Sequence, residues 1–280
     1  MPLYDRSYQR VSRARTARST RVTALARETV KLLLRRRALL ALLAFSWIPA
    51  LVRAVQIYAS HQFPQAADFF SVSAAMWQEF LGQQVRLLPV VLVSLYVGAG
   101  AIASDFASGA YVLYLSKPIS QLDYVAGRAL PVLGAICFVT LVPGLALLAL
   151  ELAIAGDTSI LRLEPWLPVS IVSYSLWLAL YFTILVLSIS SLSRSGRVAG
   201  AGFAALVLGT EVVLRGAAQG LTSTDVPLTP GIVSAAVDSG HVFFRDASGS
   251  SWSSIFVMAL SMVVCALILR RRLASSEVVQ

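Results

Sequence analysis

The stretch Ser104-Asp-Phe-Ala-Ser-Gly-Ala-Tyr-Val-Leu-Tyr-Leu-Ser-Lys-Pro118, followed by Ile119-Ser-Gln-Leu-Asp-Tyr-Val-Ala-Gly-Arg128, separates two long apolar runs. The i, i+3, i+4 and i+7 positions of a helical face are taken by Phe106, Gly109, Ala110 and Leu113. Ser104 or Asp105 can cap this helix, because a side-chain oxygen there accepts a hydrogen bond from an amide one turn later. Pro118 ends it, since proline disfavours helical geometry at the preceding residue. We expect a helix over 104–118 that lies at a membrane surface, either offered to a soluble partner or serving as a plain connector.

Composition places the chain in a membrane. Of its 280 residues, 57% are hydrophobic and only 13% are charged, whereas about a quarter of the residues in a soluble domain are charged. Six segments are long enough, or nearly so, to cross an apolar core that needs about 20 helical residues. They are Ala38–Ala59, Arg86–Ala103, Val125–Ile154, Trp166–Leu192, Val198–Leu214 and Trp252–Leu269. We therefore predict an all-α membrane protein with six transmembrane helices.

An amphipathic helix is predicted before the first span. Apolar and small side chains share one face, and Arg27, Lys31 and Arg35 lie mostly elsewhere. That face consists of Val22, Leu25, Ala26, Thr29, Val30, Leu33 and Leu34. This pattern is typical of a helix on an anionic membrane surface, so membrane lipids are expected partners. The predicted organisation is a basic N-terminus with an interfacial helix (1–37), one six-span domain (38–273) and a short tail (274–280).

The distribution of charge predicts the orientation. Eleven basic residues lie within the first 37 positions, and further ones lie at Lys117 and Arg128, at Arg194 and Arg197, and in Arg270–Arg272. These positions alternate with the predicted spans so that they all fall on one side. Lys and Arg accumulate in cytoplasmic segments. We therefore expect both termini in the cytoplasm.

Two segments on the other side are too apolar for free loops. Ser60–Val85 contains Phe69-Phe70, Met76-Trp77 and Phe80-Leu81, and we expect it to form helices on the outer membrane-facing surface. Residues 215–251 form the longest external connection and include Pro227-Leu-Thr-Pro230. A half-apolar segment of this length before a short span predicts a re-entrant or interfacial hairpin.

Ionisable side chains near the spans are candidates for a path or gate, because burying a charge in a membrane is costly. They are Arg53, Arg86, Glu151, Glu211 and Arg215. Glu211 and Arg215 are spaced i, i+4, which lets them pair on a helix. Structural ion pairing with snorkelling is one interpretation of these residues. A polar lining at the outer mouth of a translocation path is the other.

Catalytic and cofactor motifs are missing from the sequence. There is no G-x-x-x-x-G-K-[ST] loop for a nucleotide, and no nucleophile–base pattern. His61 and His241 are the only histidines and fall in predicted external segments, so we expect no metal site. The arginine-rich N-terminus carries no fold signature of nucleic-acid binding. We therefore expect this chain to have no catalytic residue, no metal, no cofactor of its own and no nucleic-acid partner.

The region 104–128 resembles the corresponding loop in bacterial membrane subunits of ABC exporters of the ABC-2 type. That family has an acidic residue followed by glycine four positions later, then a Leu-Ser/Ala-x-Pro-Ile/Val-Ser run and a basic residue before span three. Here these positions are Asp105, Gly109, Leu115-Ser-Lys-Pro-Ile-Ser120 and Arg128. The six spans and the basic N-terminus also resemble the family.

The resemblance implies a permease of the bacterial cytoplasmic (inner) membrane that is not itself an enzyme. A second permease copy or a related permease would complete the path, and two separate ABC ATPase subunits would bind ATP and Mg²⁺. Accessory periplasmic or membrane subunits are compatible with it. It also implies a coupling role for Asp105, Phe106, Gly109, Ala110, Leu113, Lys117, Pro118 and Arg128. An ion-coupled secondary carrier and a non-transporting membrane anchor for a soluble complex are the alternatives.

Overall fold

The computed structural model describes residues 18–63, 72–110, 120–156, 159–221, 231–245 and 251–275; the side chains of residues 18–21, 214–221, 251 and 274–275 are not described. All regular elements in these ranges are helices. Six helices or helix runs are long and apolar enough to cross a membrane. They are Arg37–Gln62, Pro89–Ser108, Gln121–Ala155, Leu167–Leu192, Gly196–Val213 and Trp252–Leu273. The prediction of an all-α chain with six such spans is confirmed, with small shifts at the ends.

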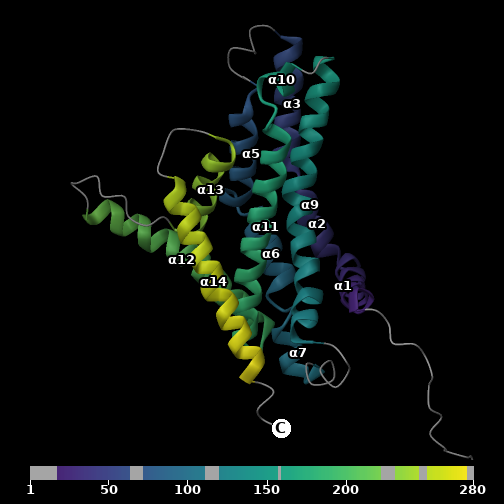
Figure 1. Ribbon diagram of the computed structural model, residues 1–280, viewed down its shortest axis with the longest axis vertical. Coiled ribbons are helices and arrows are strands. Elements are labelled where there is room, and N and C mark those ends of the chain that lie inside the picture. Colours follow the sequence, from purple (N-terminus) through teal and green to yellow (C-terminus); the bar gives the residue numbers. More distant parts are fainter. Residues whose placement is uncertain are drawn as a thin grey trace, which may run out of the picture.

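The helices form one elongated bundle (Figure 1). Their bounds are α1 Arg18–Leu34, α2 Arg37–Ser46, α3 Ile48–Gln62, α5 Ala74–Arg86, α6 Pro89–Gly98, α7 Ala103–Ser108, α9 Gln121–Ala155, α10 Ser159–Leu163, α11 Leu167–Leu192, α12 Gly196–Leu221, α13 Ile232–Phe243 and α14 Ser251–Ser275. In Figure 1, α10 lies at one end of the long axis, and α7 and the C-terminal end of α14 lie at the other. Helix α1 lies beside the α7 end of the bundle.

Prolines mark two breaks in the helices before the third span. The first span bends from α2 into α3 at Trp47, and a proline occupies the first turn of α3, where the missing amide costs no helical bond. Between α5 and α6, Leu88 has a φ of +73°, a left-handed conformation that is strained for leucine. Pro89 follows it and disfavours ordinary helical geometry at Leu88. By contrast, α9 continues through Pro131 and Pro143 for 35 residues.

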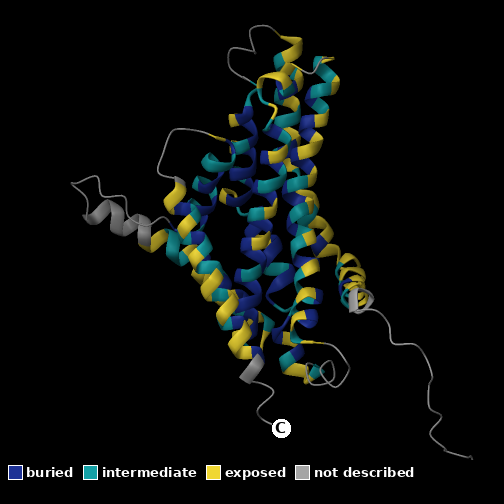
Figure 2. Cartoon of the chain, in the orientation of Figure 1, coloured by how far each residue is buried: buried dark blue, intermediate teal, exposed yellow. Residues whose placement is uncertain are grey.

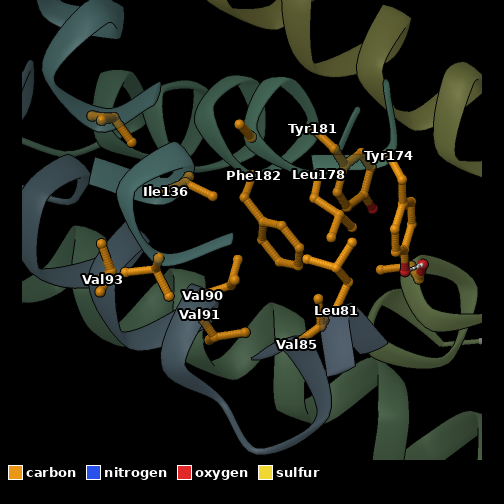
Figure 3. Close-up of a cluster of buried hydrophobic side chains, with 14 of the residues drawn as sticks. Leu81, Val85, Val90, Val91, Val93, Ile136, Tyr174, Leu178, Tyr181 and Phe182 are labelled. Atoms are coloured by element: carbon orange, nitrogen blue, oxygen red, sulfur yellow. Dashed lines mark hydrogen bonds between the residues drawn. The ribbon is translucent and has the colours of Figure 1, made fainter. Parts of the chain in front are cut away.

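The centre of the bundle consists of α5, α6, α9 and α11. Figure 3 shows the apolar side chains through which these four helices meet. They include Leu81, Val85, Val90, Val91, Val93, Ile136, Leu178 and Phe182. The most apolar part of α11 is 61% buried, whereas those of α12 and α14 are 22% and 17% buried, as the exposed colouring of α14 illustrates (Figure 2). The outer helices therefore leave apolar faces for lipid or another chain.

Helix α5 corrects the prediction for the segment between the first two spans. Trp77, Phe80 and Leu81 are completely buried rather than laid on an outer surface. The Trp77 indole donates to the Gly144 carbonyl of α9 (3.3 Å), and the Gln84 amide donates to the carbonyl of Ser46 (3.2 Å). The apolar stripe of α5 faces other helices. The sequence pattern alone does not distinguish a stripe that faces other helices from one that faces lipid.

The long external connection, predicted as a hairpin, is described only in part. Helix α12 continues through Leu221, which shortens the connection, and α13 packs against α5 and α14. Residues 222–230 and 246–250, which belong to the predicted hairpin, lie outside the described residues. Within the described part, the connection therefore contains one apolar helix that belongs to the bundle.

Gly98 allows α6 to approach α11 closely, and its replacement by alanine is expected to loosen this contact. A Cβ at Gly98 would lie 2.4 Å from Val186 Cγ1, and the branched valine has few alternative rotamers. Such overpacking typically costs about 1–3 kcal/mol. Thermal unfolding in detergent should show a lower midpoint for Gly98→Ala. Gly134→Ala, whose Cβ would meet nothing within 4 Å, should keep or raise the midpoint, and Val186→Ala added to Gly98→Ala should restore it.

Candidate functional site

The break between α6 and α7 is held by one buried hydroxyl from α11. Ser190 Oγ accepts hydrogen bonds from the amides of Ile102 (3.1 Å) and Ala103 (3.0 Å). The same hydroxyl donates to the carbonyl of Ala99 at 2.8 Å. Backbone groups at a helix break must find partners inside a membrane protein. The Ser190 hydroxyl is the hydrogen-bond partner of three backbone groups at this break, and it therefore holds the start of α7 against α11.

Asp105 ties α7 to the third span. Its side chain is 9% exposed, and Arg128 Nη2 donates to both carboxylate oxygens at 2.6 and 2.5 Å. The Tyr124 hydroxyl donates to Asp105 Oδ2 at 2.6 Å, and the Arg128 guanidinium lies 5.9 Å from the centre of the Tyr124 ring. Tyr124 itself is completely buried. The pair is therefore a buried, charge-assisted contact between residues 23 positions apart in the chain.

The same arginine reaches the N-terminal helix. Arg128 Nη1 donates to the hydroxyl of Thr29 on α1 at 3.3 Å. One residue earlier, Gly127 lets α1 approach, since a Cβ there would lie 2.6 Å from the Leu25 side chain. We call Thr29, Asp105, Tyr124, Arg128 and Ser190 the α7 junction. It links α7 directly to α9 and α11 and, through Arg128, to α1.

The structure corrects the predicted helix over residues 104–118. Helix α7 ends at Ser108, because Gly109 has a φ of +69°, a left-handed conformation that ends helices. Neither predicted cap is used: Ile102 precedes the helix without a side-chain cap, and the Asp105 carboxylate turns toward Arg128. Phe106 packs partly against the core, so it does not share a free face with Gly109 and Ala110. Leu113, Lys117 and Pro118 lie outside the described residues.

The exposed face of α7 is formed by Ser104, Ala107 and Ser108. These residues also line an open cavity of about 990 Å³ between α6, α7 and the start of α12. Arg194 and Arg197 lie on its other side. Glycine lets the start of α12 lie close to the segment between α6 and α7, since a Cβ at Gly196 would lie 3.2 Å from Gly100 Cα.

The chain re-enters the bundle at a well-formed helix start. The Ser120 hydroxyl accepts from the Asp123 amide (3.2 Å), and Asp123 Oδ2 accepts from the Ser120 amide (3.4 Å). This is a capping box, in which two otherwise free amides are bonded reciprocally. It places Tyr124 and Arg128 one and two turns later, where they meet Asp105.

Arg53 and Arg86, two of the candidate path residues, lie near one small polar cavity. Arg53 of α3 pairs with Glu79 of α5 at 3.0 Å. Glu79, Arg86, Gln78 and His241 line a cavity of about 270 Å³ between α5 and α13. Gln78 Nε2 lies 2.8 Å from His241 Nδ1 across it. Arg86 is exposed at the end of α5.

The other candidate path residues lie in separate contacts. Glu151 of α9 is buried, and His61 Nε2 of α3 lies 3.1 Å from both of its carboxylate oxygens. Glu211 of α12 accepts from the Ser234 amide (3.1 Å) in the first turn of α13, where a negative charge is favourable. The side chain of Arg215 lies outside the described residues, so the Glu211–Arg215 pair stays a prediction. These contacts join helices two by two rather than forming one lined path.

Sequence reasoning missed Ser190, Tyr124 and Thr29. The run Ser188-Ile-Ser-Ser191 is a polar cluster in an apolar span and was the available signal for Ser190. In the described ranges, no three His, Cys, Asp or Glu side chains gather closely enough to hold a metal ion. No protein-family model and no curated protein matches this chain.

Proposed function

We propose that this chain is the membrane-spanning permease subunit of an ATP-driven exporter and that it is moved by separate ATPase subunits. The observation that carries the proposal is the α7 junction. A short helix with an exposed face lies at one end of a broken span, where Ser190 ties it to α11 and Arg128 ties it to α9. The same arginine contacts Thr29 of α1. An element held in this way can pass a push from outside the membrane to several spans at once.

The α7 end of the bundle is the cytoplasmic side in this proposal. Arg128 contacts Asp105 of α7, and Arg194 and Arg197 line a cavity together with α7. Arg270–Arg272 lie in the last turns of α14, and the basic helix α1 lies beside the same end. Basic residues accumulate on the cytoplasmic side of membranes. Helix α1 and the C-terminal end of α14 share it, which fits an even number of spans (Figure 1).

The ATPase would bind the exposed face of α7 and the segment that follows Gly109. Asp105 and Arg128 would position α7 without touching the partner, because both side chains are nearly buried. Binding and hydrolysis of ATP can shift the permease only if the partner contacts α7 differently in the two states. Movement of α7 would then be passed to α11 through Ser190 and to α9 and α1 through Arg128.

A second permease copy would complete the path. Helix α12 exposes Val198, Leu206, Leu208, Val212 and Val213. Beside it lies the 990 Å³ cavity, which is open on the bundle surface and contains two arginines. An exposed apolar helix next to an open cavity that contains two arginines suits a path formed between two chains better than a path within one.

Placing an arginine at Ala107 is expected to weaken partner binding without unfolding the bundle. Ala107 is exposed on α7, so the bundle accommodates the longer side chain in solvent. A loss of at least about tenfold in stimulated ATPase activity corresponds to about 1.4 kcal/mol of interface energy. The measurement is copurification of an ABC ATPase and its activity in lipid, with and without this chain. Ala153→Arg, at an exposed position near the far end of α9, is the matched control and should behave as the wild type.

The outcomes separate the alternatives. Transport driven by an ion gradient with no ATPase present would favour a secondary carrier. Copurification of a soluble partner without transport would favour a membrane anchor. If Ala107→Arg retains full ATPase stimulation and partner yield, α7 is not the docking element.

A further inference from the structure

An apolar groove lies between α1, α2 and α9, beside the α7 junction. Its volume is about 830 Å³, within the range of roughly 300–1,000 Å³ for ligand cavities. Its lining includes Leu33 and Leu34 of α1, Leu39 and Leu43 of α2, and Gly134 and Phe138 of α9. The space above Gly134 is open, since a Cβ there would meet nothing within 4 Å.

Three arginines lie in the turn that joins the α1 and α2 sides of this groove. Helix α1 passes into α2 through a tight turn, in which the Arg36 amide donates to the Leu33 carbonyl (2.9 Å). Arg35, Arg36 and Arg37 therefore lie between the lining residues of the two helices, and all three are exposed. Among the described residues, no carboxylate lies within 4 Å of their guanidinium groups. The acid nearest in sequence, Glu28, pairs with Lys31 at 2.7 Å, and this hydrogen bond lowers the pKa of Glu28.

The lining of the groove itself is apolar. The rings of Trp47 and Phe138 meet there with their centres 5.5 Å apart. Leu39 of α2 and Trp47, which directly follows α2, are eight residues apart, which is about 12 Å along a helix. A cationic turn therefore adjoins an apolar groove about as long as part of an acyl chain. This polarity matches a molecule with a negative head and an apolar tail.

We propose that the groove binds one anionic phospholipid, with an acyl chain over Gly134 and the headgroup phosphate held by Arg35–Arg37. The tails of surrounding lipids are as apolar as the groove, so the tail contributes shape complementarity and little hydrophobic driving force. The charge therefore supplies most of the preference. Each basic residue near a membrane surface favours an anionic lipid by about fivefold, so three give a preference of about a hundredfold. This inference does not depend on the proposed transport function.

The test is native mass spectrometry of the full chain in detergent with added phosphatidylglycerol or phosphatidylcholine of identical acyl chains. We expect one tightly bound phosphatidylglycerol per chain and a preference of about a hundredfold over phosphatidylcholine. Replacing Arg35, Arg36 and Arg37 together by glutamine should reduce this preference to near unity. Gly134→Phe should weaken binding at least about tenfold by filling the groove. Gly209→Phe is the matched control, because a Cβ at Gly209 of α12 also meets open space, and it should leave binding unchanged.

Three results would overturn the proposal: equal binding of the two lipids by the wild type, unchanged lipid binding by Gly134→Phe, or crosslinking of a second protein chain at Gly134 in native membranes. If Gly134→Phe does not fold, the wild-type protein is labelled with photoactivatable phosphatidylglycerol instead, and the labelled peptide is identified. Labelling of the peptide that contains Gly134 supports the site, and labelling confined to other helices contradicts it.

Discussion

Arg128→Leu is expected to lower the stability of the bundle by about 3–5 kcal/mol, because it leaves the Asp105 carboxylate buried without its cation. For a chain of this size such a loss corresponds to a fall of roughly 6–10 °C in the unfolding midpoint. Scanning fluorimetry in detergent measures it. Arg271→Leu makes the same chemical change at an exposed position of α14 and should shift stability by no more than about 0.5 kcal/mol.

A second change separates stability from coupling. Asp105→Asn combined with Arg128→Leu removes both charges while keeping an acceptor for the Tyr124 hydroxyl. Replacing both members of a buried pair is often nearly neutral, so most of the stability should return. Under the proposed function, stimulation of the ATPase should stay low, because the charged link from α7 through Arg128 is gone and only the Tyr124 hydrogen bond to α9 remains. If the double variant stimulates normally, the pair has only a stabilising role; if Arg128→Leu melts as the wild type does, the pair is not buried as described.

Ser190→Ala is expected to release the start of α7. The change leaves the amides of Ile102 and Ala103 without their acceptor in a buried place. Each such group costs about 1–3 kcal/mol, so the total is about 2–6 kcal/mol. Hydrogen exchange measured by mass spectrometry should show lower protection in the peptide that spans residues 99–108. A fall in the unfolding midpoint should accompany it.

Ser94→Ala is the matched control for this prediction. Ser94 is also completely buried, but its hydroxyl donates only to the Val90 carbonyl of its own helix. Because a helix interior already supplies that carbonyl with a partner, the loss should be about 1 kcal/mol or less. Unchanged exchange at 99–108 in Ser190→Ala would mean that α7 is held by Asp105 alone.

The two sets of contacts in the α7 junction, Asp105 with Arg128 and Ser190 with the start of α7, differ in how far the sequence predicts them. Asp105 and Arg128 were selected through a family resemblance, and the structure brings them together with two hydrogen bonds. Ser190 lies 87 residues from its partner Ala103, and no local pattern relates the two. The end of α7 at Gly109 was missed because a glycine inside an apolar helical pattern reads as a face position until its φ is known.

The amino-acid sequence by itself determined the six apolar spans and the helical class. Those properties depend on length, hydropathy and charge, which are local and additive along the chain. Only the tertiary structure decided that α5 is buried, that α7 is short, and that Asp105 faces Arg128 while Glu151 faces His61. An apolar residue gives the same hydropathy pattern whether it faces lipid or another helix. A charged residue in a span needs a buried partner, but the sequence does not say which residue that partner is. Packing makes that choice, because it depends on which helices can approach closely at their small residues.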